Sequence, residues 1–456
     1  MDLNAIRLKQ RKYFESGATL PVHFRIEKLK QLRASVLAHE AEISAALAAD
    51  LGKNNFEAFM CETGLVLEEL SYLIKNLKKL AAEKPAHTPL VSFPGRSYVK
   101  PEPLGNVLII SPWNYPFLLC IEPLADAIAA GNTAMLKPSS NAPETAKITG
   151  RIIRECFAEE YVFCACDCIE AARSLAKEKF DLIFFTGSVA AGREIYMHAA
   201  ENLTPAVLEL GGKSPCIVDE SADIKIAARR IVFGKFLNCG QTCVAPDYVL
   251  CHYSAAAELR KQLAEQIKLQ YGEEPLLNPG YGRIVNRKHF DRLCGLIASS
   301  NIFYGGKSDK SALKIEPSVI CDVSWQDKIM QEEIFGPLLP VLEYKEKTEI
   351  FEILAEKPKP LALYIFSKDN AAARHIIEKC RFGGGCINDT IMHLASSEMG
   401  FGGVGESGIG SYHGEAGFRA FSHYKSIYCN KTWPDLPFRY MPHNDKFLSF
   451  IKRLLG

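Results

Sequence analysis

Hydrophobic side chains near the start of the chain recur with the period of an α-helix. Between residues 24 and 49 they alternate with charged residues, and this spacing predicts one amphipathic surface helix. The period returns between Leu67 and Leu80 and stops before Pro85. The stretch 85–103 then combines prolines with valine, tyrosine and phenylalanine, and we predict an extended segment that leaves its own domain.

From residue 106 the pattern changes to short apolar runs separated by helical stretches. Such runs are typical of strands buried on both faces, because helices cover both sides of a parallel sheet. The predicted strands are 107–110, 133–137, 161–163, 181–185 and 206–210. A second α/β alternation runs from Pro215 to about Asn388. Strands that alternate with helices predict an α/β fold with a doubly wound parallel sheet.

Several boundaries can also be predicted. A helix at about 116–130 is expected to end at Gly131 in a left-handed C-cap, and Asn141 is expected to cap the helix that follows. A late strand at 424–428 is expected to pair either with the 85–103 segment or with a partner subunit. These two segments therefore predict a β arm outside the main sheets.

The chain has 456 residues, a length that favours two or three domains. Its 48% hydrophobic and 23% charged residues are ordinary for a soluble protein, and a net charge of +1 gives no electrostatic case for nucleic acid as a partner. Fifteen cysteines without a secretory signal predict reduced thiols in the cytoplasm. The apolar segment 447–456 is shorter than the roughly 20 residues of a membrane-spanning helix, so no membrane span is expected.

Candidate chemistry begins with the segment 236–246, in which Cys239 and Cys243 stand four residues apart beside a glycine and two amides. A thiol there is a nucleophile, a metal ligand or core filling, because free cysteine behaves as a small buried hydrophobe. The nearest histidines, His198 and His252, are not placed like the partners of a zinc site, so no metal is expected. The residues alone leave nucleophile and core filling open for both cysteines.

Three further segments change this picture: Ser111-Pro-Trp-Asn-Tyr-Pro-Phe117, Leu208-Glu-Leu-Gly-Gly-Lys213 and Glu332-Glu-Ile-Phe-Gly-Pro337. In this order with the cysteine segment, they resemble the aldehyde dehydrogenase superfamily from roughly residue 20 to roughly residue 430. The early position of Asn114 and the segment Tyr412-His413-Gly414 resemble its class 3 branch. The resemblance implies a homodimer that uses NAD or NADP to oxidise a medium-chain, long-chain or aromatic aldehyde to the carboxylic acid.

The resemblance also implies three catalytic residues. Cys243, in Gly240-Gln-Thr-Cys243, matches the family's nucleophile and Cys239 does not, so a thiohemiacetal and then a thioester would form on Cys243. Asn114 and the backbone N–H of Cys243 would stabilise the oxyanion, although the residue type alone also fits a turn. Glu209 would activate the water that hydrolyses the thioester, although a lone acid at a strand end is often only solvated.

The implied cofactor residues lie around the predicted strand ends. Gly187 and Gly192 follow a strand with the spacing G-x-x-x-x-G, so a helix N-terminus would face the pyrophosphate. Ser140 stands where many NAD-preferring relatives have a glutamate, so we hypothesise that NADP is accepted at least comparably to NAD. By residue type alone, Lys137 is a solvated residue at a strand end, and Ser140 either caps the following helix or faces water. The implied cofactor set is Ser111, Trp113, Lys137, Ser140, Gly187, Ser188, Gly192, Leu210, Gly211, Glu333 and Phe335, and the implied substrate-pocket set is Thr242, Phe401 and His413.

The expected domains follow from these motifs and from the resemblance. Residues 1–81 and 103–210 are expected to form a Rossmann-like, doubly wound NAD(P)-binding domain, and 211–410 a second α/β domain that carries the nucleophilic cysteine. Segments 82–102 and 411–456 are expected to form a small β arm for bridging and oligomerisation.

Two other functions remain compatible with parts of the sequence. One is a cysteine acyl-transferase or thioester hydrolase that needs no redox cofactor, and the other is a non-catalytic scaffold with the same fold. The implied cofactor residues Lys137, Gly187 and Glu333 argue against the first. The presence of all three implied catalytic residues argues against the second, because a scaffold has no chemical need for them.

Overall fold

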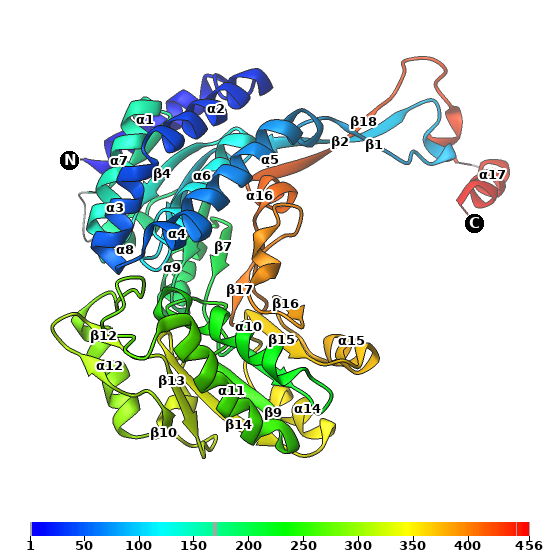
Figure 1. The fold of residues 1–456 in the computed structure, drawn as a ribbon. Helices are drawn as coiled ribbons and strands as arrows, with labels where there is room; N and C mark the ends of the chain where they lie inside the picture. The colour runs from blue at the N-terminus through cyan, green and yellow to red at the C-terminus, as the bar shows by residue number, and fades with distance from the viewer. Residues whose placement is uncertain (1, 167–170, 444, 456) are drawn as a thin grey trace.

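The computed structural model of the protein describes residues 2–166, 171–443 and 445–455. Figure 1 shows two α/β bodies, one blue to teal and one green to yellow, and a β arm that extends away from the first body. Within the described residues the strands form a six-stranded sheet, a seven-stranded sheet, a three-stranded sheet and a two-stranded ribbon. The two large sheets are parallel apart from one edge strand each, which confirms the predicted α/β fold class.

The first sheet contains the strands predicted from the short apolar runs. These strands are β3 (Asn106–Ile110), β4 (Thr133–Lys137), β5 (Val162–Cys164), β6 (Leu182–Thr186) and β7 (Ala206–Glu209). The sheet also contains the short edge strand β17 (Gly408–Ile409), which was not predicted. The order is β17-β7-β6-β3-β4-β5, and β17 runs antiparallel to β7. In β3, Leu108 and Ile110 pack in one apolar core, whereas Val107 and Ile109 pack in another. Both faces of the sheet are therefore buried.

Helices cover both faces of this sheet. One face packs against α1 (Leu3–Glu15), α8 (Ala171–Ala176) and α9 (Val189–Glu201). The other face packs against α2 (Val22–Ala38), α5 (Gly64–Leu80), α6 (Leu118–Ala130) and α7 (Pro143–Cys156), and α3 (Glu40–Leu51) lies against α7. The helix α6 ends as predicted, with Gly131 in the left-handed region at φ 100°.

Two predicted helix boundaries are wrong. The single helix predicted for 24–49 is broken at His39, which leaves the helical conformation and separates α2 from α3. Asn141 does not cap α7. Instead, the carboxylate of Asp50, at the end of α3, accepts hydrogen bonds from the first backbone N–H groups of α7, including that of Thr145 at 2.8 Å. The cap comes from a distant helix, so local sequence could not identify it.

The second sheet has the order β10-β13-β14-β9-β8-β15-β16, and β10 runs antiparallel to β13. Its strands are β8 (Pro215–Val218), β9 (Tyr248–His252), β10 (Asn301–Tyr304), β13 (Ser318–Cys321), β14 (Leu338–Tyr344), β15 (Ala362–Phe366) and β16 (Gly384–Ile387). The helices of this body are α10 (Ile224–Phe236), α11 (Tyr253–Tyr271), α12 (Arg287–Ala298), α13 (Lys328–Gln331), α14 (Lys347–Glu356) and α15 (Asn370–Lys379). The ribbon is β11 (Ser308–Asp309) with β12 (Lys314–Ile315).

The arm consists of β1 (Lys84–Ala86), β2 (Arg96–Pro103) and β18 (Ser422–Cys429), all antiparallel. Tyr424 lies opposite Pro101 and Tyr428 opposite Ser97, so the predicted late strand pairs with the 85–103 segment of its own chain. The remaining elements are α4 (Asn55–Ala58), the π-helical turn η1 (Phe59–Thr63), the short 3-10 turns η2 (Leu90–Ser92), η3 (Leu237–Gly240), η4 (Met392–Ala395) and η5 (Pro437–Arg439), α16 (Gly414–Ala420) and α17 (Asp445–Leu455).

Candidate active site

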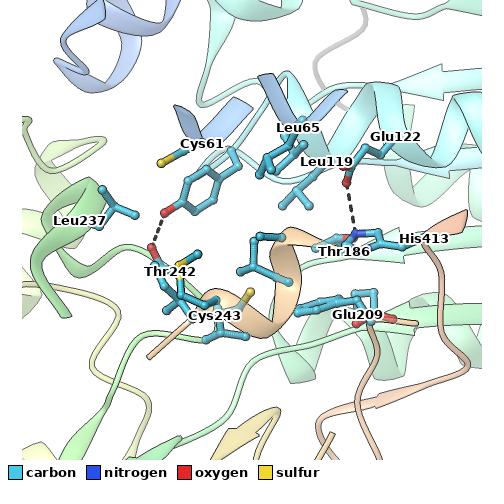
Figure 2. A pocket seen from close by; sticks show the side chains of 18 of the residues that line it. Cys61, Leu65, Leu119, Glu122, Thr186, Glu209, Leu237, Thr242, Cys243 and His413 are labelled. Atoms are coloured by element: carbon cyan, nitrogen blue, oxygen red, sulfur yellow. Dashed lines mark hydrogen bonds and ion pairs between the residues drawn. The ribbon is translucent and has the colours of Figure 1, made fainter. Parts of the chain in front are cut away.

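An apolar pocket lies where the first sheet, the helices α5 and α6 and the loops of the second body meet (Figure 2). Five residues implied by the sequence motifs line it together, although they come from distant parts of the chain: Glu209, Thr242, Cys243, Phe401 and His413. Apolar side chains form most of the remaining wall, among them Met60, Leu65, Leu118, Leu119, Phe233 and Leu237. The pocket therefore joins a thiol and a carboxyl group within a largely hydrocarbon wall.

The backbone turns sharply around the two cysteines and separates them. Asn238 and Cys239 both adopt the left-handed conformation, with φ of 51° and 55°. Cys239 is 2% exposed and packs with Tyr281 in the core of the second sheet. Cys243 instead faces the pocket, as Figure 2 shows. Of the two thiols, Cys243 therefore occupies the position at which a substrate can be attacked.

The surroundings of Cys243 favour its protonated form. Burial raises the pKa of Cys243 to about 12, and the nearby carboxyl groups of Glu333 and Glu209 act in the same direction. The thiolate is the nucleophilic form of cysteine. Attack by Cys243 therefore requires a proton acceptor or an added positive charge in the pocket.

Asn114 is fixed to the loop that carries Cys243. Its side chain is buried, and Nδ2 donates to the carbonyl oxygen of Gln241 at 3.1 Å. Asn238 Nδ2 donates to the carbonyl oxygens of both Asn114 and Gln241, at 2.9 and 3.1 Å. Tyr115, the residue after Asn114, shares a 2.6 Å hydrogen bond between its hydroxyl and Thr242 Oγ1. An amide nitrogen carries two N–H groups, so Asn114 retains one for a second acceptor.

Glu209 is the last residue of β7 and is 3% exposed. Neither of its carboxyl oxygens has a hydrogen-bond partner within the described chain. Burial raises the pKa of Glu209 well above its ordinary value, because no neighbouring donor stabilises the carboxylate. A carboxyl group in this state binds a proton strongly and shares its pocket with Cys243.

His413 lies in the pocket wall opposite Glu122. Its Nε2 is 3.3 Å from Glu122 Oε2, and its ring stacks on Phe401 with the centroids 5.5 Å apart. Burial by itself lowers the pKa of His413, but Glu122 and then Glu69 outweigh burial, so the pKa is raised. No family motif points to Glu122. The available signal was the pair of acids Glu122 and Asp126, four residues apart in an otherwise apolar helix.

The implied phosphate-binding residues surround the start of α9. Ser188 caps this helix by accepting from the backbone N–H of Ala191 at 3.3 Å, directly after β6. A Cβ atom on Gly192 would collide with the side chain of Leu210, and one on Gly211 would collide with the carboxyl group of Glu333. Leu210 and Glu333 therefore pack closely against these two glycines and would have to move for any larger residue, and the helix N-terminus is of the kind that binds phosphate.

The other implied cofactor residues lie on two sides of these glycines. Burial raises the pKa of Glu333 to about 8, with Asp247 acting in the same direction. Trp113 contacts the ring of Phe335 edge-on, with centroids 5.4 Å apart. Lys137 is buried at the end of β4, where Nζ donates to the carbonyl oxygen of Pro138 at 2.6 Å, and Ser140 is exposed beyond it. Ser111 is buried just after β3.

These observations test whether the chain fits a nicotinamide dinucleotide. Apart from Glu333 and Phe335, which come from the second body, the implied residues lie at or after the carboxyl ends of β3, β4, β6 and β7, the edge at which ligands bind in parallel α/β sheets. The glycines beside the N-terminus of α9 suit a pyrophosphate. Glu333 provides an acceptor for ribose hydroxyl groups, and Phe335 an apolar surface beside it. The residues present therefore fit the cofactor.

Comparisons with known proteins agree with this geometry. A family model described as the aldehyde dehydrogenase family matches residues 2–427. The chain is 46% identical over 442 residues to the 4,4'-diaponeurosporen-aldehyde dehydrogenase of Staphylococcus aureus, covering 96% of each. It is 41% identical to aldehyde dehydrogenase family 3 member A2 of Mus musculus, covering 100% of this chain and 94% of that protein. It is 42% identical to the dimeric NADP-preferring aldehyde dehydrogenase of Canis lupus familiaris, covering 95% and 96%. The structure of the substrate-bound state of Staphylococcus aureus AldH superposes with a TM-score of 0.98 at 44% identity, covering 100% of both chains.

The chain belongs to the aldehyde dehydrogenase family, within its family 3 branch. It is an oxidoreductase that acts on aldehydes, and its cofactor is NAD or NADP. The predicted family, enzyme class and cofactor class are thus confirmed. Among the described residues no helix is both long enough and apolar enough to cross a membrane.

Proposed function

We propose that the protein oxidises medium-chain or long-chain aliphatic aldehydes, or aromatic aldehydes, to carboxylic acids. The observation that carries this proposal is the apolar pocket shared by Cys243 and the unpaired carboxyl group of Glu209. A hydrocarbon wall stabilises an apolar chain by removing it from water. The name of the Staphylococcus aureus relative, 4,4'-diaponeurosporen-aldehyde dehydrogenase, supports an apolar aldehyde.

In the first half-reaction, Cys243 Sγ bonds to the aldehyde carbon as the carbon–oxygen double bond opens; the thiol proton passes through solvent to the resulting oxyanion and a thiohemiacetal forms. The free N–H of Asn114 Nδ2 and the backbone N–H of Cys243 are the donors for the oxyanion, and one such donor typically contributes about 10²–10³ in rate. The network that fixes Asn114 to Gln241 keeps its donor in place before the substrate arrives. NAD or NADP held at the start of α9 would supply the acceptor for the hydride of the thiohemiacetal carbon; the hydroxyl proton would pass to solvent and a thioester would remain on Cys243.

In the second half-reaction, Glu209 accepts a proton from a water molecule as that water attacks the thioester carbon. The carbon–sulfur bond breaks, the acid leaves, and the proton held by Glu209 passes to Cys243 Sγ and restores the thiol. The raised pKa of Glu209 suits this step, because a buried carboxylate without donors has a high affinity for the proton of water.

We also propose that NADP is accepted at least comparably to NAD. Ser140 is exposed beyond the end of β4 and offers a hydroxyl where a carboxylate would repel a 2′-phosphate. Like charges about 4 Å apart cost on the order of 4 kcal/mol at an effective dielectric near 20, before screening. One relative is named as NADP-preferring.

The choice of cofactor is tested by kcat/KM for NAD and NADP in the wild type and in Ser140→Glu. The variant is expected to lose more than about tenfold in efficiency with NADP and little with NAD, because repulsion acts on the extra phosphate alone. A wild type strongly selective for NAD, or an unchanged NADP efficiency in the variant, would contradict this proposal.

The proposed functional units follow the expected domains. Residues 1–81 and 103–210 bind the cofactor, 211–410 carry the nucleophile, and 82–102 with 411–456 bridge two subunits in a homodimer. Within the part of the chain that the structure describes, the outer edge of β18 pairs with no other strand, and an unpaired edge is suited to a second copy. The described cysteines are free thiols, a state that suits the cytoplasm.

The principal experiment is a panel of short, medium, long and aromatic aldehydes with each cofactor, followed by the absorbance of the reduced cofactor. We expect kcat/KM to rise with chain length by up to about fourfold per methylene, since each buried methylene contributes about 0.8 kcal/mol. A preference for short or charged aldehydes would contradict the proposed substrate class. Absence of cofactor reduction with every aldehyde would contradict the proposed reaction.

A further inference from the structure

A buried ion pair lies directly behind Asn114. Lys53 Nζ is 2.5 Å from Glu62 Oε1, and both side chains are fully buried. Lys53 Nζ also donates to the carbonyl oxygen of Asn114 at 3.0 Å and lies 4.0 Å from the ring centroid of Tyr115. The ammonium group therefore contacts both residues that bond to the Cys243 loop.

The second oxygen of Glu62 holds the other end of the same segment. Glu62 Oε2 accepts from the backbone N–H groups of Phe117 and Leu118, at 2.9 and 3.1 Å. These groups belong to the start of α6, where a negative charge is favoured by the unpaired N–H groups and the helix dipole. Lys53 thus hydrogen-bonds the carbonyl group at the start of the segment 114–118, and Glu62 hydrogen-bonds the N–H groups at its end.

The local backbone is shaped to present Glu62 in this position. Glu62 lies in the π-helical turn η1, in which the N–H of Gly64 donates to the carbonyl oxygen of Phe59. A Cβ on Gly64 would lie 2.8 Å from that oxygen, so the turn depends on glycine. In the same turn, Met60 and Cys61 line the pocket. π-Helical turns are rare and occur frequently at functional sites.

A contribution to folding stability does not by itself explain why the chain buries the ion pair of Lys53 and Glu62. Removing two charges from water is costly, and replacing a buried ion pair with apolar residues is often neutral or stabilising. The contacts of this pair are instead directed at the segment that carries Asn114. This arrangement favours a positioning role over a contribution to folding.

We propose that Lys53 and Glu62 are positioning residues for the oxyanion site. They fix the 114–118 segment so that Asn114 Nδ2 is held beside the Cys243 loop before the aldehyde binds. A misplacement of about 1 Å can reduce a rate roughly a hundredfold, which sets the scale of the expected effect. The inference rests on the proposed role of Asn114 in the first half-reaction.

The test is the double variant Lys53→Met/Glu62→Gln, which removes both charges together and keeps an oxygen acceptor at position 62. We expect the melting temperature and the affinity for the cofactor to stay near the wild-type values. The rate constant of the first burst of cofactor reduction is expected to fall roughly ten- to a hundredfold with little change in KM. A stable double variant with a wild-type burst would overturn the proposal.

Two further variants complete this test, one as an alternative to the double variant and one as a control. Lys53→Gln/Glu62→Gln serves if the methionine variant does not fold: glutamine is shorter than lysine, so its contact with the Asn114 carbonyl is weakened and a smaller loss of the same kind is expected. The matched control is Lys347→Met/Glu220→Gln, which removes a surface ion pair of 3.1 Å on the second body, away from the pocket and the arm. The control is expected to keep the wild-type burst, and a comparable loss in it would overturn the assignment to the buried pair.

A cycle with Asn114→Ala separates this inference from the function on which it rests. If the pair acts through Asn114, adding Lys53→Met/Glu62→Gln to Asn114→Ala slows the burst no further. A full additional loss would show that the pair acts elsewhere and would overturn the inference while leaving the role of Asn114 intact. If Asn114→Ala alone keeps the wild-type burst, the proposed oxyanion role fails, and the positioning role fails with it.

Discussion

The two sides of the pocket differ in whether their buried polar groups are hydrogen-bonded. On the Cys243 side, the buried polar groups of Asn114, Asn238 and Gln241 hydrogen-bond one another, and the ion pair behind them is also satisfied. On the Glu209 side, both carboxyl oxygens of Glu209 and the hydroxyl of Thr186 are buried without a partner within the described chain. Hydrogen bonds fix the groups on the Cys243 side in one arrangement. The carboxyl oxygens on the Glu209 side have no such bonds and can accept a proton.

This difference matches the two proposed half-reactions. Attack on a carbonyl depends on donors that are fixed before the charge develops. Activation of water depends on a base with a high proton affinity, and hydrogen bonds to a carboxylate would lower that affinity. The pocket can therefore be analysed one side at a time, by substitutions that affect one half-reaction and spare the other.

The largest effect is expected for Cys243→Ala, which removes the nucleophile. We expect turnover to fall by about four orders of magnitude or more, because loss of a nucleophile removes the covalent route altogether. Cofactor binding, measured by titration of protein fluorescence, is expected to stay nearly intact. Cys239→Ala is the control and is expected to keep most of the activity, since Cys239 packs in the second core. Retained turnover in Cys243→Ala would assign the chemistry to Cys239.

The second effect concerns the opposite side of the pocket. Glu209→Gln is expected to keep a fast first burst of cofactor reduction and to slow the steady rate about 10²–10⁴-fold, because it removes the general base of hydrolysis. Asn114→Ala is the matched comparison and is expected to slow the burst itself. A Glu209→Gln variant without a burst would place Glu209 in the first half-reaction and would remove the contrast between the two sides.

The raised pKa of Glu209 also predicts that the steady rate depends on pH. The pKa of Glu209 is raised by burial, so the fraction of carboxylate grows as pH rises through that raised value. The steady rate of the wild type is therefore expected to increase with pH across this range, and the rate of Glu209→Gln is expected to lose that increase. A parallel pH profile in wild type and variant would show that another group limits hydrolysis.

Sequence patterns predicted the parts of this molecule that depend on local spacing. The five strands β3 to β7 of the first sheet lie within one residue of their predicted bounds, because apolar runs indicate burial on both faces, whereas the short edge strand β17 was not predicted. Motifs likewise selected Cys243 and Glu209, which the fold brings to one pocket. Their roles remain predictions.

Contacts between distant segments were beyond the reach of sequence patterns. The cap of α7 comes from Asp50, and the support of Asn114 comes from Lys53, 61 residues away. Glu122 meets His413 only because α6 packs against the segment that leads into α16. Spacing within a motif carries no information about such partners, since they are set by the packing of whole helices.

The smallest effect is expected for Asp126→Asn, which tests whether the buried acids Asp126, Glu122 and Glu69 near His413 lower stability. Asp126 is fully buried on α6, and burial, followed by repulsion from Glu69 and Glu122, raises the pKa of Asp126 well above its ordinary value. A raised pKa contributes stability that is complete below the unfolded value of about 3.9 and is lost as pH rises towards the folded value. The amide of the variant does not titrate and so carries no such loss. We therefore expect melting temperatures that agree at pH about 4 and are higher in the variant by several degrees at pH about 8.

Asp309→Asn is the control, because the pKa of Asp309 is shifted in the opposite direction. Asp309 is partly exposed and accepts hydrogen bonds from Ser311 Oγ and from the backbone N–H groups of Ser311 and Ala312. The hydrogen bond from the Ser311 hydroxyl, with those from the backbone, lowers the pKa of Asp309. Its stabilising contribution is present above the unfolded pKa and disappears as pH falls through the folded one. Asp309→Asn is therefore expected to melt slightly below the wild type at neutral pH and to match it in acid. An Asp126→Asn variant that also melts below the wild type at pH about 8 would show that its carboxyl group is satisfied in the fold.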